Sequence, residues 1–108
     1  MEHPGLTPMV KIEVVVDASD VDFVERLLAG EGVSGWTAMP GISGFGHHGR
    51  SEGRLLFNER TGPTMLVAVL APEHLEGVVE GLRVFFSDHH GVLFVSDVSV
   101  SRPDYFRS

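Results

Sequence analysis

Hydrophobic and polar residues alternate near the start of the chain. The apolar positions are separated by single residues: Val10, Ile12, Val14 and Val16. A period of two is typical of a strand with one buried face, so we predict a strand over residues 10–16. A second segment, residues 65–70, is almost entirely apolar and rich in strand-forming side chains. This run predicts a buried central strand.

The segment after the first strand has the spacing of an amphipathic helix. Its apolar residues fall on one helix face: Val21, Val24, Leu27 and Leu28. Residues 17–22 supply several candidates for the N-terminal cap, and Ser19 is the best placed of them. Gly30 and Gly32 predict the end of this helix, because glycine readily adopts the left-handed conformation found there.

A second helix is predicted over residues 72–86. Pro72 suits the first helical position, and Glu73 and Glu76 place negative charge in the first turns. The residues of its apolar face recur every three or four positions: Leu75, Val78, Val79, Leu82, Phe85 and Phe86. Gly77 and Gly81 weaken the helix, so we expect a close packing contact to compensate.

Two further strands complete the pattern, at residues 35–39 and 92–100. Residues 87–91 form a tight turn before the last strand, and residues 44–63 form a long loop with neither periodicity. The order βαββαβ predicts an α+β, ferredoxin-like fold, in which a four-stranded antiparallel sheet carries two helices on one face. We expect a single domain over residues 1–108.

The composition of the chain argues against several classes of function. The 108 residues carry a formal net charge of −7, which disfavours binding to nucleic acid. The chain has no cysteine, so disulfides, thiolate nucleophiles and cysteine-based metal sites are excluded. No apolar run reaches the roughly 20 residues of a membrane span, and the N-terminus lacks the pattern of a secretory signal. We therefore expect a cytoplasmic protein.

The loop at residues 44–63 is basic and rich in glycine, unlike the acidic remainder of the chain. It contains Arg50, Arg54 and Arg60, and it begins with Gly44-Phe45-Gly46. Arginine side chains and free backbone N–H groups together suit the capture of a small anion. The alternative is a solvated loop whose arginines provide solubility. Neither a dinucleotide-binding nor a P-loop glycine motif is present.

Two histidine pairs, His47-His48 and His89-His90, lie beside glycines in different predicted loops. Neighbouring loop histidines are usually solvent-exposed, and no carboxylate spacing indicates a dedicated metal site. If the loops meet, the imidazoles instead form a donor-rich rim around a phosphate. We identify no catalytic residues, because no nucleophile motif accompanies the serine, aspartate and histidine of residues 87–90.

The chain resembles the PII family of signalling proteins. Gly35-Trp36-Thr37 followed by Gly44-Phe45-Gly46 is similar to the family pattern at the base of its T-loop. The segment that begins at Gly91 is similar to the final strand of PII proteins, and Arg102 lies near the position of their phosphate-binding arginines. The resemblance spans roughly residues 10–102.

The resemblance implies a homotrimer that binds adenine nucleotides in clefts between subunits. Residues 44–63 then correspond to the T-loop, residues 87–91 to the B-loop and residues 102–108 to a C-terminal tail. The implied nucleotide-binding residues are Thr37, Gly44, Phe45, Gly46, His47, His48, His89, His90, Gly91 and Arg102. Arg102 is expected to reach a cleft of the adjacent subunit.

The chain departs from many PII proteins at Val92, where they carry a phosphate-binding lysine. ADP and AMP are therefore favoured over ATP, although ATP stays a candidate. The likeness is strongest to the carboxysome-associated PII-like group, CPII, which implies a regulator of inorganic-carbon acquisition that also binds bicarbonate. Arg50, Arg54 and Arg60 are the bicarbonate candidates.

This assignment implies a regulatory protein, not an enzyme, with no covalent cofactor. Its T-loop is expected to act on an unidentified target protein, and a bicarbonate transporter is one candidate. The alternative is a metal-binding trimer of the CutA-like kind, in which the histidine pairs supply the ligands.

Overall fold

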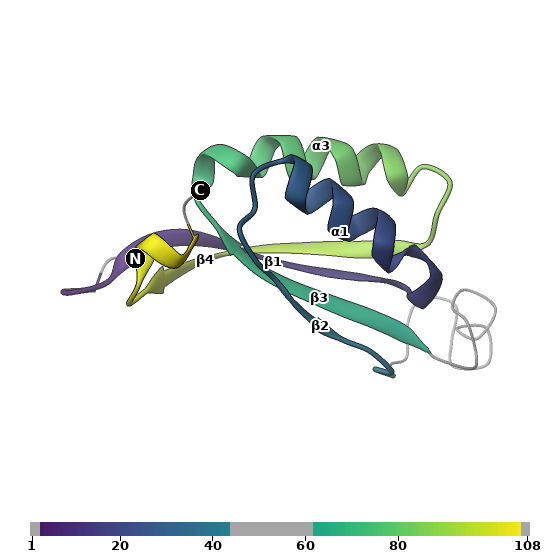
Figure 1. The fold of residues 1–108 in the computed structure, drawn as a ribbon, viewed down its shortest axis with the longest axis horizontal. Coiled ribbons are helices and arrows are strands. Elements are labelled where there is room, and N and C mark those ends of the chain that lie inside the picture. The colour runs from purple at the N-terminus through teal and green to yellow at the C-terminus, as the bar shows by residue number, and fades with distance from the viewer. Residues whose placement is uncertain (1–2, 44–61, 107–108) are drawn as a thin grey trace.

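The computed structural model describes residues 3–43 and 62–106. Its strands and α-helices follow the predicted βαββαβ order (Figure 1). Their bounds are β1 Thr7–Asp17, α1 Val21–Gly30, β2 Thr37–Met39, β3 Pro63–Leu70, α3 Leu75–Phe85 and β4 Gly91–Val100. Short 3-10 helices occur at η1 Ala18–Asp20, η2 Pro72–His74 and η3 Pro103–Phe106.

The strands form one four-stranded antiparallel sheet in the order β2-β3-β1-β4. The pairing of β1 with β4 runs from Thr7 opposite Val100 to Val16 opposite Gly91. Both α1 and α3 cover the same face of this sheet (Figure 1). The predicted fold, an antiparallel sheet with two helices on one face, is confirmed.

Side chains of β1 point alternately to the two faces of the sheet. Alternate side chains are fully buried beneath the helices: Ile12, Val14 and Val16. The residues between them are only half-buried on the opposite face: Lys11, Glu13 and Val15. β1 is longer than the predicted residues 10–16, because its first residues pair with β4 without showing an alternating pattern of their own.

The predicted helix faces supply the other half of the core. Val24 and Leu28 of α1 and Val78, Leu82 and Phe85 of α3 are buried against the sheet. Partly buried residues pack around them: Val21, Leu27, Trp36, Leu75, Phe86 and Leu93. Burial of these apolar side chains is the main driving force for this arrangement.

The start of the first helix differs from the prediction. Ser19 is not the cap: its backbone N–H and its hydroxyl both donate hydrogen bonds to Asp17 Oδ1, at 3.0 and 3.2 Å. The chain first makes the turn η1, so Asp17 occupies the capping position ahead of α1. The second helix also begins with a 3-10 turn, η2, and Pro72 lies in its first turn as expected.

Glycines fix the end of α1 and its contact with α3. Gly32 has φ of +88°, and Val33 donates to the Leu28 carbonyl at 3.0 Å, as in a Schellman motif. A side chain at Gly81 would lie 2.6 Å from a methyl carbon of Leu27. A side chain at Gly77 would overlap the Glu31 carboxylate. The expected close contact at these two α3 glycines is confirmed.

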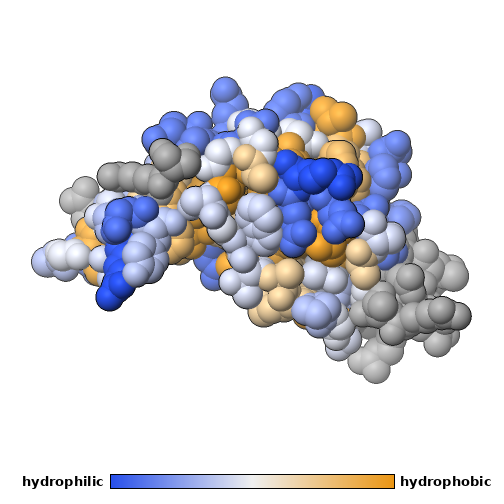
Figure 2. Space-filling view, viewed as in Figure 1, coloured by the Kyte–Doolittle hydropathy of each residue, from blue (hydrophilic) through white to orange (hydrophobic). Residues whose placement is uncertain are grey.

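The sheet face opposite the helices has no covering layer within the described part of the chain. Apolar side chains are open to solvent there, with Phe94 52% exposed, Val92 41% and Met39 39%. Partly buried valines and methionine lie beside them: Val15, Met65, Val67 and Val69. Figure 2, in the orientation of Figure 1, shows mostly hydrophilic surface over the helix layer, with smaller apolar patches among it. We call the open side the uncovered sheet face.

Candidate functional site

The predicted nucleotide-binding residues lie at different places on the sheet. His89, His90 and Gly91 are at the start of β4, whereas Arg102 follows its other end (Figure 1). A ten-residue strand spans about 30 Å. Arg102 and His89 of one chain therefore cannot hold the same phosphate group.

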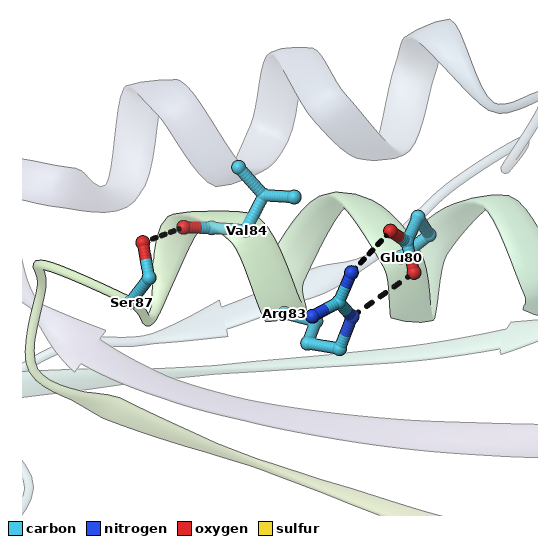
Figure 3. Close-up of polar contacts among 4 residues, drawn as sticks. All are labelled: Glu80, Arg83, Val84 and Ser87. Carbon is cyan, nitrogen blue, oxygen red and sulfur yellow. Dashed lines mark hydrogen bonds and ion pairs between the residues drawn. The ribbon is translucent and has the colours of Figure 1, made fainter.

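The turn that carries the histidines begins at the end of α3 (Figure 3). The Ser87 hydroxyl donates a hydrogen bond of 2.6 Å to the Val84 carbonyl. The Phe86 backbone N–H donates to the Leu82 carbonyl at 2.8 Å. These bonds satisfy carbonyls that the last helical turn leaves open, and they fix where the chain leaves the helix.

Arg83, in the last turn of α3, is paired within its own helix. Its Nε and Nη2 atoms donate to the two carboxylate oxygens of Glu80, at 3.1 and 2.6 Å (Figure 3). The hydrogen bonds and the opposite charge lower the pKa of Glu80 and raise the pKa of Arg83. Because Glu80 uses two of its donors, Arg83 is a poor candidate for anion binding.

The His89 imidazole is held by two acceptors. Its Nδ1 atom lies 3.1 Å from the Phe85 carbonyl oxygen and 2.7 Å from Asp88 Oδ1. Because both partners are acceptors, we place the proton on Nδ1, and the neutral ring then keeps its lone pair on Nε2. Protonation adds an N–H donor at Nε2, which suits an anionic ligand.

The surroundings of His89 favour this protonated form. Burial lowers the pKa of His89, but hydrogen bonds to the Phe85 carbonyl and to Asp88 raise it, as does the negative charge of Asp20. The net effect is a pKa above the ordinary value of 6.5. His89 therefore stays protonated to a higher pH than a free histidine, while the paired Asp88 carboxylate balances part of its charge.

An aromatic stack connects His89 to both helices. Its ring stacks on Phe85 at 4.1 Å between centroids, and Phe85 in turn stacks on Phe23 of α1 at 4.6 Å. Phe85 is 6% exposed, whereas Phe23 is 41% exposed. The position of the His89 ring is thus set by a core residue. Sequence spacing could not reveal the contact between Phe23 and Phe85, because these residues belong to distant segments.

Gly91 begins β4 in a conformation that other residues rarely adopt. Its φ is +156°, and a side chain there would lie 2.7 Å from the Val15 carbonyl oxygen. The strict need for glycine fixes the direction in which the chain passes from the turn into the sheet. His90, immediately before it, is exposed.

Thr37 lies in β2, an edge strand, where it is exposed opposite Val67. Paired residues of an antiparallel sheet point to the same face, so Thr37 belongs to the uncovered sheet face. Just before it, Trp36 Nε1 donates a 3.0 Å hydrogen bond to Glu25 Oε2 on α1. The sequence analysis did not identify this contact between α1 and the residue before β2.

Eight candidates fall on residues outside the described part of the chain: Gly44, Phe45, Gly46, His47, His48, Arg50, Arg54 and Arg60. Of the residues that flank them, Ile42 donates a backbone hydrogen bond of 3.1 Å to Pro63. Pro63 pairs with Asp17, next to the row that pairs Val16 with Gly91. Ile42 and Pro63 therefore lie at the sheet end that carries His89.

Within residues 3–43 and 62–106, no three histidine, aspartate or glutamate side chains are close enough to hold a metal ion. His89 is engaged with Asp88, and His47-His48 lies outside the described residues. The metal-binding alternative has no support in the comparisons below. Among the described helices, none is long and apolar enough to cross a membrane.

Comparisons with known proteins agree with this architecture. A family model described as nitrogen regulatory protein P-II matches residues 9–105. The structure of CPII from Thiomonas intermedia K12, a PII-like protein bound to ADP, AMP and bicarbonate, has 39% identity and a TM-score of 0.83. The alignment covers 95% of this chain and 97% of that one.

Other solved structures extend the likeness. CPII from the same organism bound to ADP and bicarbonate has 36% identity and a TM-score of 0.82, with 94% of this chain and 97% of that chain covered. A putative PII-like signalling protein from Thermus thermophilus, with 18% identity and a TM-score of 0.73, shows the shared fold alone; 94% of this chain and 97% of that chain are covered. No curated protein sequence gives a significant match.

The family model covers nearly the whole chain, and the antiparallel four-stranded sheet with two helices is consistent with the fold of that family. The matched family is one of regulatory proteins. This chain therefore belongs to the family of P-II nitrogen regulatory proteins.

Proposed function

We propose that this chain is a sensor that binds ADP or AMP in preference to ATP, together with bicarbonate. The observation that carries the proposal is the 39% identity to the CPII protein whose structure holds ADP, AMP and bicarbonate. The nucleotide-binding residues are those named from the sequence, of which the structure describes Thr37, His89, His90, Gly91 and Arg102.

The geometry supports a site shared between copies of the chain. Arg102 and His89 lie at opposite ends of β4, so a phosphate group bound by both needs residues from two subunits. The uncovered sheet face gives a reason to associate, because its exposed Phe94 and Val92 lose contact with water when another copy covers them. We therefore propose a homotrimer with nucleotide in the clefts between subunits.

The chemistry of the His89 turn favours binding of a nucleotide with one or two phosphate groups. A protonated His89 supplies one positive charge, which Asp88 partly balances, and the nearby Val92 supplies none. Fewer cations at the distal phosphates favour AMP and ADP, which carry less negative charge than ATP. The raised pKa of His89 further supports anion binding near neutral pH.

Bicarbonate is assigned to Arg50, Arg54 or Arg60 of the T-loop, since an arginine fork matches a small planar oxyanion. The loop then responds to both ligands and acts on a target protein of inorganic-carbon acquisition, for which a bicarbonate transporter is one candidate. If the two ligands stabilise one state, each strengthens the binding of the other.

Isothermal titration calorimetry with AMP, ADP and ATP, each with and without bicarbonate, tests this function. We expect ADP or AMP to bind more tightly than ATP and bicarbonate to tighten that binding. Arg102→Ala is expected to weaken ADP binding, whereas Arg26→Ala, at an exposed arginine of α1, is the matched control. The absence of nucleotide binding, or equal ADP affinity with and without bicarbonate, would contradict the corresponding part of the proposal.

Sedimentation velocity tests the assembly. We expect the mass of a trimer for the native chain and a smaller species for Phe94→Glu, which places a charge on the uncovered sheet face. The same variant should lose ADP binding, because its sites are no longer shared. Val84→Glu, at an exposed valine of the helix layer, is the control. A monomeric native chain that binds ADP would overturn the shared site.

A further inference from the structure

The guanidinium group of Arg102 is restrained by one aromatic side chain. Arg102 Nη1 donates a hydrogen bond to the Tyr105 hydroxyl, and Arg102 Cζ lies 5.2 Å from the centroid of the Tyr105 ring. Hydrogen bonding and cation–π attraction both act on the same planar group. An exposed arginine without such partners samples many rotamers, so these contacts restrict the directions in which its donors point.

Tyr105 is in turn attached to the body of the molecule. Its carbonyl oxygen accepts a 2.9 Å hydrogen bond from the Ser34 hydroxyl, in the connection between α1 and β2. Its backbone N–H donates to the Arg102 carbonyl oxygen at 3.1 Å, which closes the turn at η3. Ser34 follows Val33, a core residue that is 5% exposed. The restraint on Arg102 is thereby linked to the core.

The contact leaves most of the arginine available. Nη1 uses one donor on Tyr105, and guanidinium has five N–H groups, so a pair of donors can still bind two phosphate oxygens. The tyrosine hydroxyl is neutral and does not cancel the positive charge, in contrast to the Glu80 carboxylate that pairs with Arg83. The arrangement therefore orients the cation without neutralising it.

We propose that Tyr105 is a positioning residue that orients Arg102 toward the phosphate groups of the bound nucleotide. This inference rests on the proposed nucleotide-binding function. Tyr105 acts by reducing the rotamer freedom that Arg102 loses on binding, so its contribution is made before the ligand arrives. Its effect is confined to ligands that carry phosphate, because Arg102 has no partner on an unphosphorylated nucleoside.

Calorimetric titration of the full chain with ADP and with adenosine tests the role of Tyr105. Tyr105→Phe keeps the ring and removes the hydroxyl, and we expect it to weaken ADP binding about threefold to tenfold. Adenosine binding should not change. Ser34→Ala, which releases the Tyr105 carbonyl, should weaken ADP binding in the same direction by a smaller factor. Ser101→Ala, at an exposed neighbouring serine, is the matched control.

A double-mutant cycle separates positioning from a general effect on the fold. In an Arg102→Ala background, Tyr105→Phe should have no further effect on ADP affinity. An equal loss in that background, an equal loss for adenosine, or tighter ADP binding by Tyr105→Phe would each overturn the inference. If the native chain binds ADP and Tyr105→Phe binds it equally well, this inference alone fails. If the native chain does not bind ADP, the proposed function fails with it.

Discussion

The two ends of β4 hold the two cationic groups of the proposed site in different ways. At one end, His89 stacks on the buried Phe85 ring and bonds to the Phe85 carbonyl. At the other end, Arg102 bonds to the exposed Tyr105, whose carbonyl oxygen accepts a hydrogen bond from the Ser34 hydroxyl. Charge at the first end thus rests directly on a buried ring, whereas charge at the second reaches the core only through exposed side chains. Substitutions should separate the two ends by their effects on stability and on binding.

The largest expected effect is on stability at the His89 end. Phe85→Ala removes a buried ring that contacts Phe23, Phe86 and His89. We expect the free energy of unfolding to fall by about 3–5 kcal/mol, as for other large aromatic truncations in cores. Urea denaturation followed by circular dichroism measures this loss. A loss no larger than that for Tyr105→Ala would show that the two ends depend on the core to the same extent.

Arg102→Ala should leave stability nearly unchanged and should instead weaken ADP binding. Its side chain is exposed, so we expect the free energy of unfolding to change by no more than about 0.5 kcal/mol. ADP affinity should fall by roughly tenfold to a hundredfold, which corresponds to about 1.5–3 kcal/mol for a lost charged hydrogen bond. Denaturation and calorimetry on the same preparation test both parts. A stability loss as large as that of Phe85→Ala would show that the Arg102 end of β4 does not differ from the His89 end in its effect on stability.

Gly91→Ala tests how strictly the backbone fixes the His89 turn. The added methyl group would approach the Val15 carbonyl oxygen, and the φ of +156° is unfavourable for alanine. We expect a loss of about 1–3 kcal/mol in the free energy of unfolding. Gly35→Ala, where an added methyl group meets no atom within 4 Å, is the matched control. Equal stability of the two variants in urea would contradict the assigned strain.

The smallest effect is a pH dependence at the His89 end. The folded-state pKa of His89 is raised, so the folded chain binds more protons than the unfolded chain just above pH 6.5. The stabilising contribution is complete below this value and is lost as pH rises through the raised pKa. We expect His89→Gln to remove that part of the slope in free energy of unfolding against pH. Measurements between pH 5 and pH 8 check the sign; a slope unchanged in His89→Gln would contradict it.

Much of the fold and part of the candidate site could be predicted from the sequence. The alternation in β1 and the apolar faces of both helices are local patterns, and they are buried as expected. His89, Gly91 and Arg102 were also named as candidate site residues. The structure places His89 just before β4, Gly91 at its first position and Arg102 just after its end. The supports behind them were not identified, because Phe23, which stacks on Phe85, and Ser34, which bonds to Tyr105, come from segments far away in the sequence.

The sequence alone determined which segments form strands and helices, because the backbone geometry of each sets a period that its own residues reveal. It also determined the acidic charge and the absence of cysteine chemistry. The tertiary structure decided that Trp36 bonds to Glu25, that Phe85 stacks on Phe23 and that Ser34 bonds to Tyr105. Those contacts depend on sheet register and on how the helices pack across the sheet, and no local period encodes either.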